Sequence, residues 1–275
     1  MTSDGRNNET TSYDQMPALY DFEYPTCNGA ELDFWDGILR EYGGPALELA
    51  VGTGRVAIPL ASRGHTVFGI DVSQPMLDRA LLKQSRLPRA TRSRLHFSRQ
   101  DMRSFSFRQR FGVIYAPFNS LLLLTGEQEF ANCMGAVIGH LKDQGAFVIE
   151  AFAMADDDKE ADSEAITYLE NEPDSGATVT RKRDYSYDPS SRTALSVLSY
   201  TLEHVQGGVN EIRFQYVLQL YEAEQLLEKL GQYDFSIRNV YAGITRHNYS
   251  EDSEGLIIVC GKRRDDDFEG DRSVT

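Results

Sequence analysis

The sequence contains no long apolar segment. No run of about 18 consecutive apolar residues occurs in the chain, so no membrane-spanning helix is predicted. The opening residues, MTSDGRNNETTS, are polar and lack the apolar stretch of a secretory signal. We therefore expect a cytoplasmic protein without a membrane partner.

Cysteine is also scarce. Cys27, Cys133 and Cys260 are odd in number and far apart, so they fit neither a disulfide framework nor a zinc site. We expect three free thiols. No other group of potential ligands shows the spacing of a dedicated metal site, and no metal is expected.

Basic residues are outnumbered, because 28 Lys and Arg stand against 42 Asp and Glu, for a formal net charge of −14. A nucleic acid is bound largely through Lys and Arg that neutralise its phosphates. The one dense basic cluster, Arg86–Arg99, does not alternate with aromatic residues that could stack on bases. No nucleic-acid partner is expected.

The chain has the composition of a globular protein, with 41% hydrophobic residues in 275, and the segment pattern of an α/β fold. Apolar runs alternate with helical stretches, which is typical of a parallel sheet with crossover helices. Strands are predicted over residues 46–51, 66–70, 94–98, 112–116 and 146–151. Helices are predicted over residues 29–42, 74–84 and 130–141. A further helix is predicted to follow the glycine loop at 52–54 and to end at residue 63. Ser73 is the expected N-cap of the helix over 74–84, with Pro75 in its first turn.

The pattern changes after residue 151. Three long extended segments, 177–187, 194–205 and 211–221, are separated by turns at Asp188–Ser191 and Gly207–Gly208, which predicts antiparallel hairpins. A helix over 222–230 and strands over 235–241 and 255–260 follow. The predicted fold is therefore α/β: a doubly wound, mostly parallel, seven-stranded Rossmann-like sheet with an antiparallel β insert after strand five.

The predicted organisation has six parts. They are a disordered tail (1–12), an N-terminal helical lid (13–42), a cofactor-binding core (43–155), the β insert (165–221), a C-terminal part of the core (222–262) and a disordered acidic tail (263–275). The tails are charged or polar and contain little to bury.

A glycine loop joins the first predicted strand to the next helix in LELAVGTGRVAIPLA, residues 47–61. Such a loop lets the backbone approach a ligand, and the helix offers free N–H groups. The spacing Gly52-x-Gly54-x-x-Ala57, with Asp71 downstream, also satisfies the dinucleotide fingerprint. An NAD(P)-dependent oxidoreductase is therefore one alternative.

Two further features favour a different cofactor. Glu48 precedes the loop, where its carboxylate would repel a diphosphate but favour the ammonium and sulfonium charges of S-adenosylmethionine (SAM). Asp101–Met102 follows the third strand, where the acid can meet an adenine amino group and Met can pack on the ring. Glu48, Asp71 and Asp101 thus stand at three successive strand ends.

With these residues the chain resembles the class I SAM-dependent methyltransferases, from about Tyr13 to Lys262. The resemblance rests on ELAVGTGR (48–55), on GIDVS (69–73) with Met76–Leu77, and on Asp101–Met102. Ala50 stands where the family often has glycine. The resemblance implies SAM as cofactor and S-adenosylhomocysteine (SAH) as product.

It also implies roles for individual residues. Asp71 binds the ribose hydroxyls, Glu48 holds the α-ammonium, and Arg55 meets either the cofactor carboxylate or an acid in a surface ion pair. Asp101 takes the adenine amino group between Met76 and Met102. The residues implied to bind the cofactor are Tyr20, Glu48, Ala50, Gly52, Thr53, Gly54, Arg55, Asp71, Val72, Met76, Asp101, Met102, Ala116, Pro117 and Phe118.

The acceptor pocket is expected above the carboxyl ends of the strands. Its candidate walls are the insert and Tyr13, Tyr20, Phe22, Tyr24, Phe118, Asn119, Ser120, Glu150 and Phe152. No catalytic residue is identified; His204, His247 and Tyr20 are weak candidates for a general base.

The layout of the β insert, which ends in FQYVLQLY (214–221), is similar to that of small-molecule N-methyltransferases acting on sugar amines and glycine. This likeness implies a small-molecule acceptor and a possible homodimer, and it favours nitrogen as the methylated atom, with oxygen and carbon as alternatives. A non-catalytic SAM-binding protein and a protein or RNA methyltransferase remain alternatives.

Overall fold

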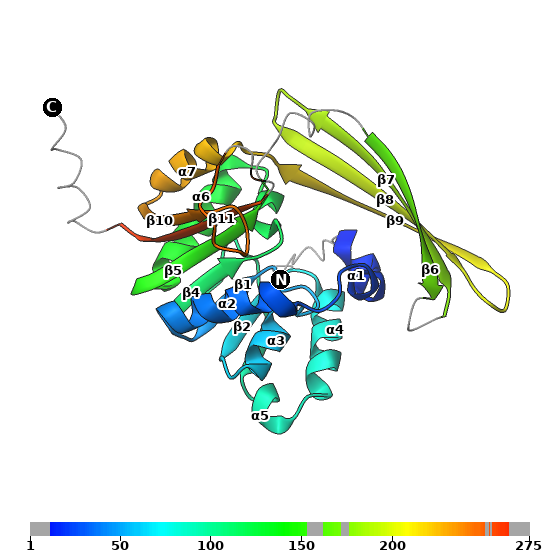
Figure 1. The fold of residues 1–275 in the computed structure, drawn as a ribbon, viewed down its shortest axis with the longest axis horizontal. Helices are drawn as coiled ribbons and strands as arrows, with labels where there is room; N and C mark the ends of the chain where they lie inside the picture. The colour runs from blue at the N-terminus through cyan, green and yellow to red at the C-terminus, as the bar shows by residue number, and fades with distance from the viewer. Residues whose placement is uncertain (1–11, 153–161, 172–175, 251–252, 254, 264–275) are drawn as a thin grey trace, which may run out of the picture.

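The computed structural model describes residues 12–152, 162–171, 176–250, 253 and 255–263. It consists of a large sheet flanked by helices and a second, separate antiparallel sheet (Figure 1). The predicted tails lie outside the described residues, except that Ser12 begins the 3₁₀ helix η1 (Ser12–Gln15) and Arg263 follows the last strand.

The large sheet has seven strands in the order β10-β11-β5-β4-β1-β2-β3. Its strands are β1 (Ala46–Leu49), β2 (Val67–Asp71), β3 (Leu95–Arg99), β4 (Phe111–Ala116), β5 (Leu141–Ala151), β10 (Phe235–Tyr241) and β11 (Leu256–Lys262). The pairs from β3 across to β5 are parallel, while β11 is antiparallel to both β5 and β10. The predicted seven-stranded, mostly parallel Rossmann-like fold is confirmed.

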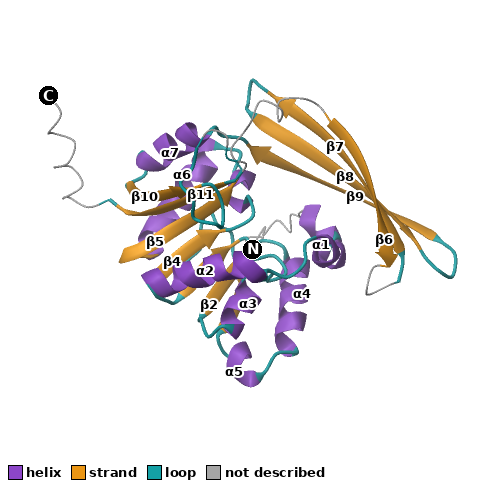
Figure 2. Ribbon diagram, viewed as in Figure 1, coloured by secondary structure: helices purple, strands orange, loops and turns teal. Residues whose placement is uncertain are grey.

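Helices cover both faces of this sheet (Figure 2). On one face lie α2 (Gly29–Tyr42), α3 (Ala57–Ser62) and α4 (Gln74–Ser85); on the other lie α6 (Glu127–His140) and α7 (Ala223–Gly231). Strand β1 is buried throughout, and its successive side chains point to opposite faces. Ala46 therefore joins the cluster around Trp35, and Leu47 joins the cluster around Phe130.

Helix α4 begins as its sequence predicts. The Ser73 hydroxyl accepts a hydrogen bond from the Met76 backbone N–H at 3.3 Å, and Pro75 occupies the first turn. A serine N-cap stabilises a helix by about 1 kcal/mol. A four-residue helix, α5 (Arg89–Arg92), follows α4 within the basic cluster.

The second sheet is the insert, with the strands β6 (Asp162–Asn171), β7 (Thr178–Asp188), β8 (Thr193–Glu203) and β9 (Val209–Gln219) in that order. The three predicted extended segments correspond to β7, β8 and β9; β6 was not predicted as a strand. The register aligns Arg183, Leu198 and Phe214 across β7, β8 and β9, so these residues share one face.

The N-terminal segment lies between the two sheets (Figure 1). It consists of η1 and α1 (Pro17–Glu23). Met16 and Leu19 are buried in a cluster with Leu198 and Phe214 of the insert, while α1 also contacts α4 of the large domain. The segment therefore joins the insert to the core by packing on both.

In the part of the chain that the structure describes, no helix has the length and apolar character needed to cross a membrane. The three cysteines are free and buried, as their spacing predicts.

Candidate cofactor and acceptor site

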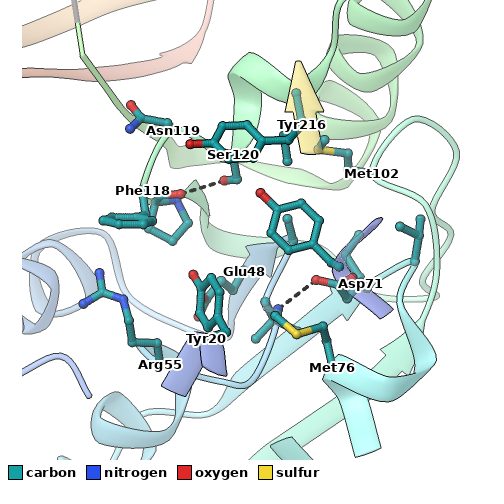
Figure 3. Close-up of a pocket in the computed structure, with 18 of the residues that line it drawn as sticks. Tyr20, Glu48, Arg55, Asp71, Met76, Met102, Phe118, Asn119, Ser120 and Tyr216 are labelled. Atoms are coloured by element: carbon teal, nitrogen blue, oxygen red, sulfur yellow. Dashed lines mark hydrogen bonds between the residues drawn. The ribbon is translucent and has the colours of Figure 1, made fainter. Parts of the chain in front are cut away.

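A cavity of about 330 Å³ lies at the carboxyl ends of β1, β2 and β4, beneath the N-terminal segment and the insert (Figure 3). All but three of the predicted cofactor residues line it: Tyr20, Glu48, Ala50, Gly52, Arg55, Asp71, Val72, Met76, Asp101, Met102, Pro117 and Phe118. Thr53, Gly54 and Ala116 do not line it.

The glycine loop takes the tight path that its composition predicts. Gly52 has φ +53°, and a Cβ added to it would lie 3.3 Å from Cε of Met76, so a side chain there would crowd the pocket wall. Ala50 also has a left-handed φ of 52°. For a residue with a Cβ this conformation costs roughly 1–2 kcal/mol. Ala50 thus preserves the backbone path of a glycine position at the cost of strain.

Asp71 is held by the loop that it faces. One carboxylate oxygen accepts the Gly52 N–H at 2.8 Å, and the other accepts the Ser73 N–H at 2.8 Å. Burial raises the pKa of Asp71, against the lowering effect of these N–H groups. Because a carboxylate oxygen has two lone pairs, each keeps one for a further donor. This arrangement fits a pair of vicinal ribose hydroxyls.

Glu48 faces the same cavity from β1 (Figure 3). Its side chain is 2% exposed, and it accepts a hydrogen bond of 2.8 Å from the Tyr115 hydroxyl. Burial raises the pKa of Glu48 to about 8, so a cation is needed beside it to favour the ionised form near neutral pH. The α-ammonium of SAM is such a cation.

Arg55 forms an ion pair with Glu31 of α2, one of whose hydrogen bonds measures 2.9 Å. The ion pair considered from the sequence is therefore present, but the Arg55 side chain is only 12% exposed, so the pair is largely buried rather than on the surface. Its guanidinium lies 5.0 Å from the ring centre of Phe118, across the mouth of the pocket.

Asp101 lies at the opposite end of the pocket with Met102. Its carboxylate accepts hydrogen bonds from the Arg103 backbone N–H at 2.8 Å and from the Arg103 guanidinium at 2.9 Å. These bonds outweigh burial and lower the pKa of Asp101. An adenine amino group bound here would therefore share the carboxylate with Arg103.

The loop after β4 has an unusual backbone. Phe118 and Asn119 have consecutive left-handed φ values of 53° and 62°. A Glu150 carboxylate oxygen accepts the Phe118 N–H at 2.9 Å, and the Asn119 side-chain oxygen accepts the Phe152 N–H at 2.7 Å. Glu150 and Phe152, predicted as pocket walls, do not line the pocket but hold this loop. The predicted wall residue Phe22 is also absent from the lining and packs against the insert cluster instead.

The roof of the pocket is apolar and aromatic. It combines side chains of the insert, of η1 and of η2 (Ser120–Leu123), because β9 contacts both short helices. Its rings are in contact: Tyr13 and Phe214 have centroids 4.7 Å apart, and Tyr24 lies 5.0 Å from both Tyr20 and Phe118. Lining residues that the sequence did not single out are Met16, Val51, Val56, Ile70, Gln100, Arg103, Leu123, Leu124, Glu129 and Leu198. These residue types occur throughout the chain, so the sequence alone does not mark these positions as pocket residues.

None of the three candidate bases is suited to take a proton from an acceptor in the pocket. His204 lies in the turn between β8 and β9, and His247 is exposed in the loop after β10; neither lines the pocket. Tyr20 does line it, but burial raises its pKa above the usual range, so its hydroxyl stays protonated. Within the described residues, no group of three or more His, Cys, Asp and Glu side chains is arranged to hold a metal ion.

Comparison with known proteins finds a family likeness in the core of the chain, where residues 46–145 match the model of the methyltransferase domain family. These residues contain β1 to β4 and the glycine loop. The matched segment therefore contains the part of the pocket formed by Glu48, the glycine loop and Asp71, which we call the floor. The predicted resemblance to the SAM-dependent methyltransferases is confirmed.

Relatives extend the likeness beyond this segment. The chain is 29% identical over 188 residues to the cypemycin N-terminal methyltransferase of a Streptomyces species, an alignment covering 68% of this chain and 70% of that protein. The structure of the CcbJ methyltransferase from Streptomyces caelestis superposes with a TM-score of 0.75 at 22% identity, covering 92% of this chain and 99% of the other. A SAM-bound amino pentose methyltransferase from Micromonospora echinaspora gives a TM-score of 0.66 at 18% identity, covering 89% and 97%. At these identities the two structures show a shared fold that includes the insert.

Proposed function

We propose that the protein transfers the methyl group of SAM to an amine nitrogen of a small molecule. The observation that carries the proposal is a contrast within one pocket. Its floor presents Asp71 and Glu48 in positions suited to SAM. Its lining, in the described part of the chain, includes no His, Lys or Cys, and its other carboxylates, Asp101 and Glu129, are paired with Arg103.

The floor suits SAM better than a dinucleotide. When bound, SAM supplies a methyl group on a positively charged sulfur, which is open to in-line attack. Buried Glu48 stabilises positive charge beside the loop and disfavours the diphosphate of NAD(P). Asp71 and the Gly52 backbone fix the ribose, so the chain orients the donor without taking part in bond breaking.

The roof favours an amine acceptor. An amine becomes nucleophilic once its ammonium form has lost a proton to solvent, whereas a hydroxyl acceptor needs a positioned base or a metal. Three tyrosines of the pocket, Tyr13, Tyr20 and Tyr24, are held in the protonated form, since burial raises the pKa of each. These hydroxyls can orient an amine by hydrogen bonding but do not deprotonate an alcohol.

The names of two relatives agree with this chemistry. One methylates an N-terminus and another an amino pentose, as their names state. An N-terminus and an amino group on a pentose share nitrogen but belong to different scaffolds. We therefore propose nitrogen as the methylated atom and leave the identity of the acceptor molecule to experiment.

The test uses SAM with a labelled methyl group and matched acceptor pairs, such as 2-phenylethylamine with 2-phenylethanol and glucosamine with glucose. We expect label to appear only on amines, at a rate that rises as the pH approaches the amine pKa. Transfer to an alcohol would overturn the choice of nitrogen. In parallel calorimetry we expect binding of SAH but not of NAD; the reverse result would overturn the donor assignment.

A further inference from the structure

Asp21 of α1 does not line the pocket, yet it joins three parts of the molecule. Its side chain is 18% exposed and accepts three hydrogen bonds: from the Thr53 hydroxyl at 2.6 Å, from Arg79 at 2.8 Å and from Lys83 at 2.7 Å. Thr53 belongs to the glycine loop, while Arg79 and Lys83 belong to α4. No part of the proposed transfer reaction uses this carboxylate directly.

The bond to Thr53 gives the loop a second carboxylate contact, next to that of Asp71. The Thr53 side chain is fully buried, and the preceding Gly52 N–H donates to Asp71. Two consecutive loop residues are therefore held by two carboxylates, one from β2 and one from the N-terminal segment. Asp71 faces the pocket, whereas Asp21 holds the loop from outside it.

Charge keeps this contact in place. Burial acts to raise the pKa of Asp21, but hydrogen bonds from Arg79 and Lys83 outweigh it and lower the pKa. Asp21 is therefore an anion at neutral pH, and an anion is a stronger acceptor for the Thr53 hydroxyl than a neutral group.

Asp21 also sets the position of its neighbour in sequence. Tyr20 enters the cavity beside Glu48, at the end away from Met102 (Figure 3). At the other end of the same helical turn, Glu23 bonds to Arg181 of β7 and Tyr200 of β8. One turn of α1 thus carries a bond to the loop, a pocket residue and a bond to the insert.

We propose that Asp21 is a positioning residue that fixes the glycine loop and Tyr20 relative to each other, so that the cofactor site is complete only when α1 is docked. The inference rests on the proposed function, because it concerns the site assigned to SAM. It makes the N-terminal segment part of the donor site rather than a cover for the acceptor alone.

The test compares Asp21→Asn with Glu23→Gln by calorimetric titration of SAH. Both changes replace a carboxylate by its amide on the same turn of α1, but only the first acts on the glycine loop. We expect about a tenfold rise in the SAH dissociation constant for Asp21→Asn, within the range for weakening hydrogen bonds to a charged group. For Glu23→Gln we expect a change of less than twofold.

Thr53→Val separates positioning from general stability. If Asp21 acts through Thr53, the single Thr53→Val change should weaken SAH binding, and adding it to Asp21→Asn should have almost no further effect. Asp21→Glu should recover part of the affinity. Thermal unfolding of each variant reports its stability independently of SAH.

Equal SAH affinities for the wild type and Asp21→Asn would overturn the inference, as would equal losses in Asp21→Asn and Glu23→Gln. Fully additive effects of Asp21→Asn and Thr53→Val would overturn it too. If the wild type itself fails to bind SAH, it is the proposed function that fails, so the two failures are distinct.

Discussion

The floor and the roof of the pocket are built in different ways. The floor consists of loops at the ends of β1 and β2, and its Asp71 carboxylate is held by the backbone N–H groups of Ser73, two residues on, and of Gly52, 19 residues back at the end of β1. The roof consists of aromatic and aliphatic side chains from η1, η2 and β9, which are far apart in sequence. Donor recognition is thus encoded locally, whereas acceptor recognition depends on assembly of the whole chain.

The difference extends to the kind of interaction. Directional hydrogen bonds in the floor specify particular chemical groups, such as a diol or an ammonium. Ring contacts in the roof, with centroid distances of about 5 Å, specify shape and apolar area instead. Substitutions in the floor should therefore act on SAH affinity, and substitutions in the roof should act on the acceptor.

The largest effect on SAH affinity is expected for Asp71→Ala. This change removes the two oxygens that we propose accept the ribose hydroxyls, together with the bonds from Gly52 and Ser73 that shape the loop. Since a hydrogen bond to a charged group contributes about 1.5–3 kcal/mol, a loss of about 100-fold or more is expected. Calorimetric titration of SAH measures it; an affinity within tenfold of the wild type would contradict the assignment of Asp71.

A smaller effect, of about tenfold, is expected for Glu48→Gln, with a distinctive dependence on protons. Because the pKa of Glu48 is about 8 in the free protein, the ammonium of SAH should displace its proton on binding at pH 7. Wild-type titrations in buffers with different ionisation enthalpies should show release of up to one proton. Glu48→Gln should release none, and the same release in both proteins would contradict the assignment.

Glu48 also predicts the direction of a stability change. Between its ordinary pKa near 4.5 and about 8, folded Glu48 keeps a proton that the unfolded chain has lost. The free energy of unfolding should therefore fall as the pH rises through this window, by at most about 1.4 kcal/mol per pH unit. The difference between wild type and Glu48→Gln in denaturant titrations isolates this contribution from those of other groups.

The smallest effect on SAH binding is expected from the roof. Phe214→Ala leaves a cavity in the insert cluster, where the side chain is 3% exposed, and should cost about 3–5 kcal/mol of stability. We expect SAH affinity to change less than threefold while methyl transfer to the amine falls. Phe214→Leu gives a milder version, and Gln215→Ala, on the exposed face of the same strand, is the matched control. A loss of SAH affinity as large as that of Asp71→Ala would remove the distinction between floor and roof.

The floor of the pocket was predictable from the sequence because short-range sequence patterns specify it. The apolar strand before Gly52, the acid ending the next strand and the Ser73 cap are all short-range patterns, and α2 and β10 have the predicted bounds. The elements missed are weakly patterned: α1 is only seven residues long, and β6 is an edge strand of the insert.

Long-range contacts were not predictable from any pattern in the chain. Asp21 and Thr53 are 32 residues apart, and Glu23 and Arg181 are 158 apart, so no periodicity connects them. The sequence likewise did not show that Glu150 would bond to the Phe118 backbone instead of facing the pocket. Such pairings are fixed only when the sheets and the N-terminal segment pack together.

The separation of the two sheets has a consequence for how acceptor range could change. The insert strands pair only with one another among the described residues, so no strand of the insert shares a hydrogen-bond register with β1 or β2. Side chains on β8 therefore reach the glycine loop through the N-terminal segment, which packs on Leu198 and bonds to Thr53. We predict that a combinatorial library confined to Leu198, Phe214, Tyr216 and Leu218 changes the range of acceptors more than the affinity for SAH.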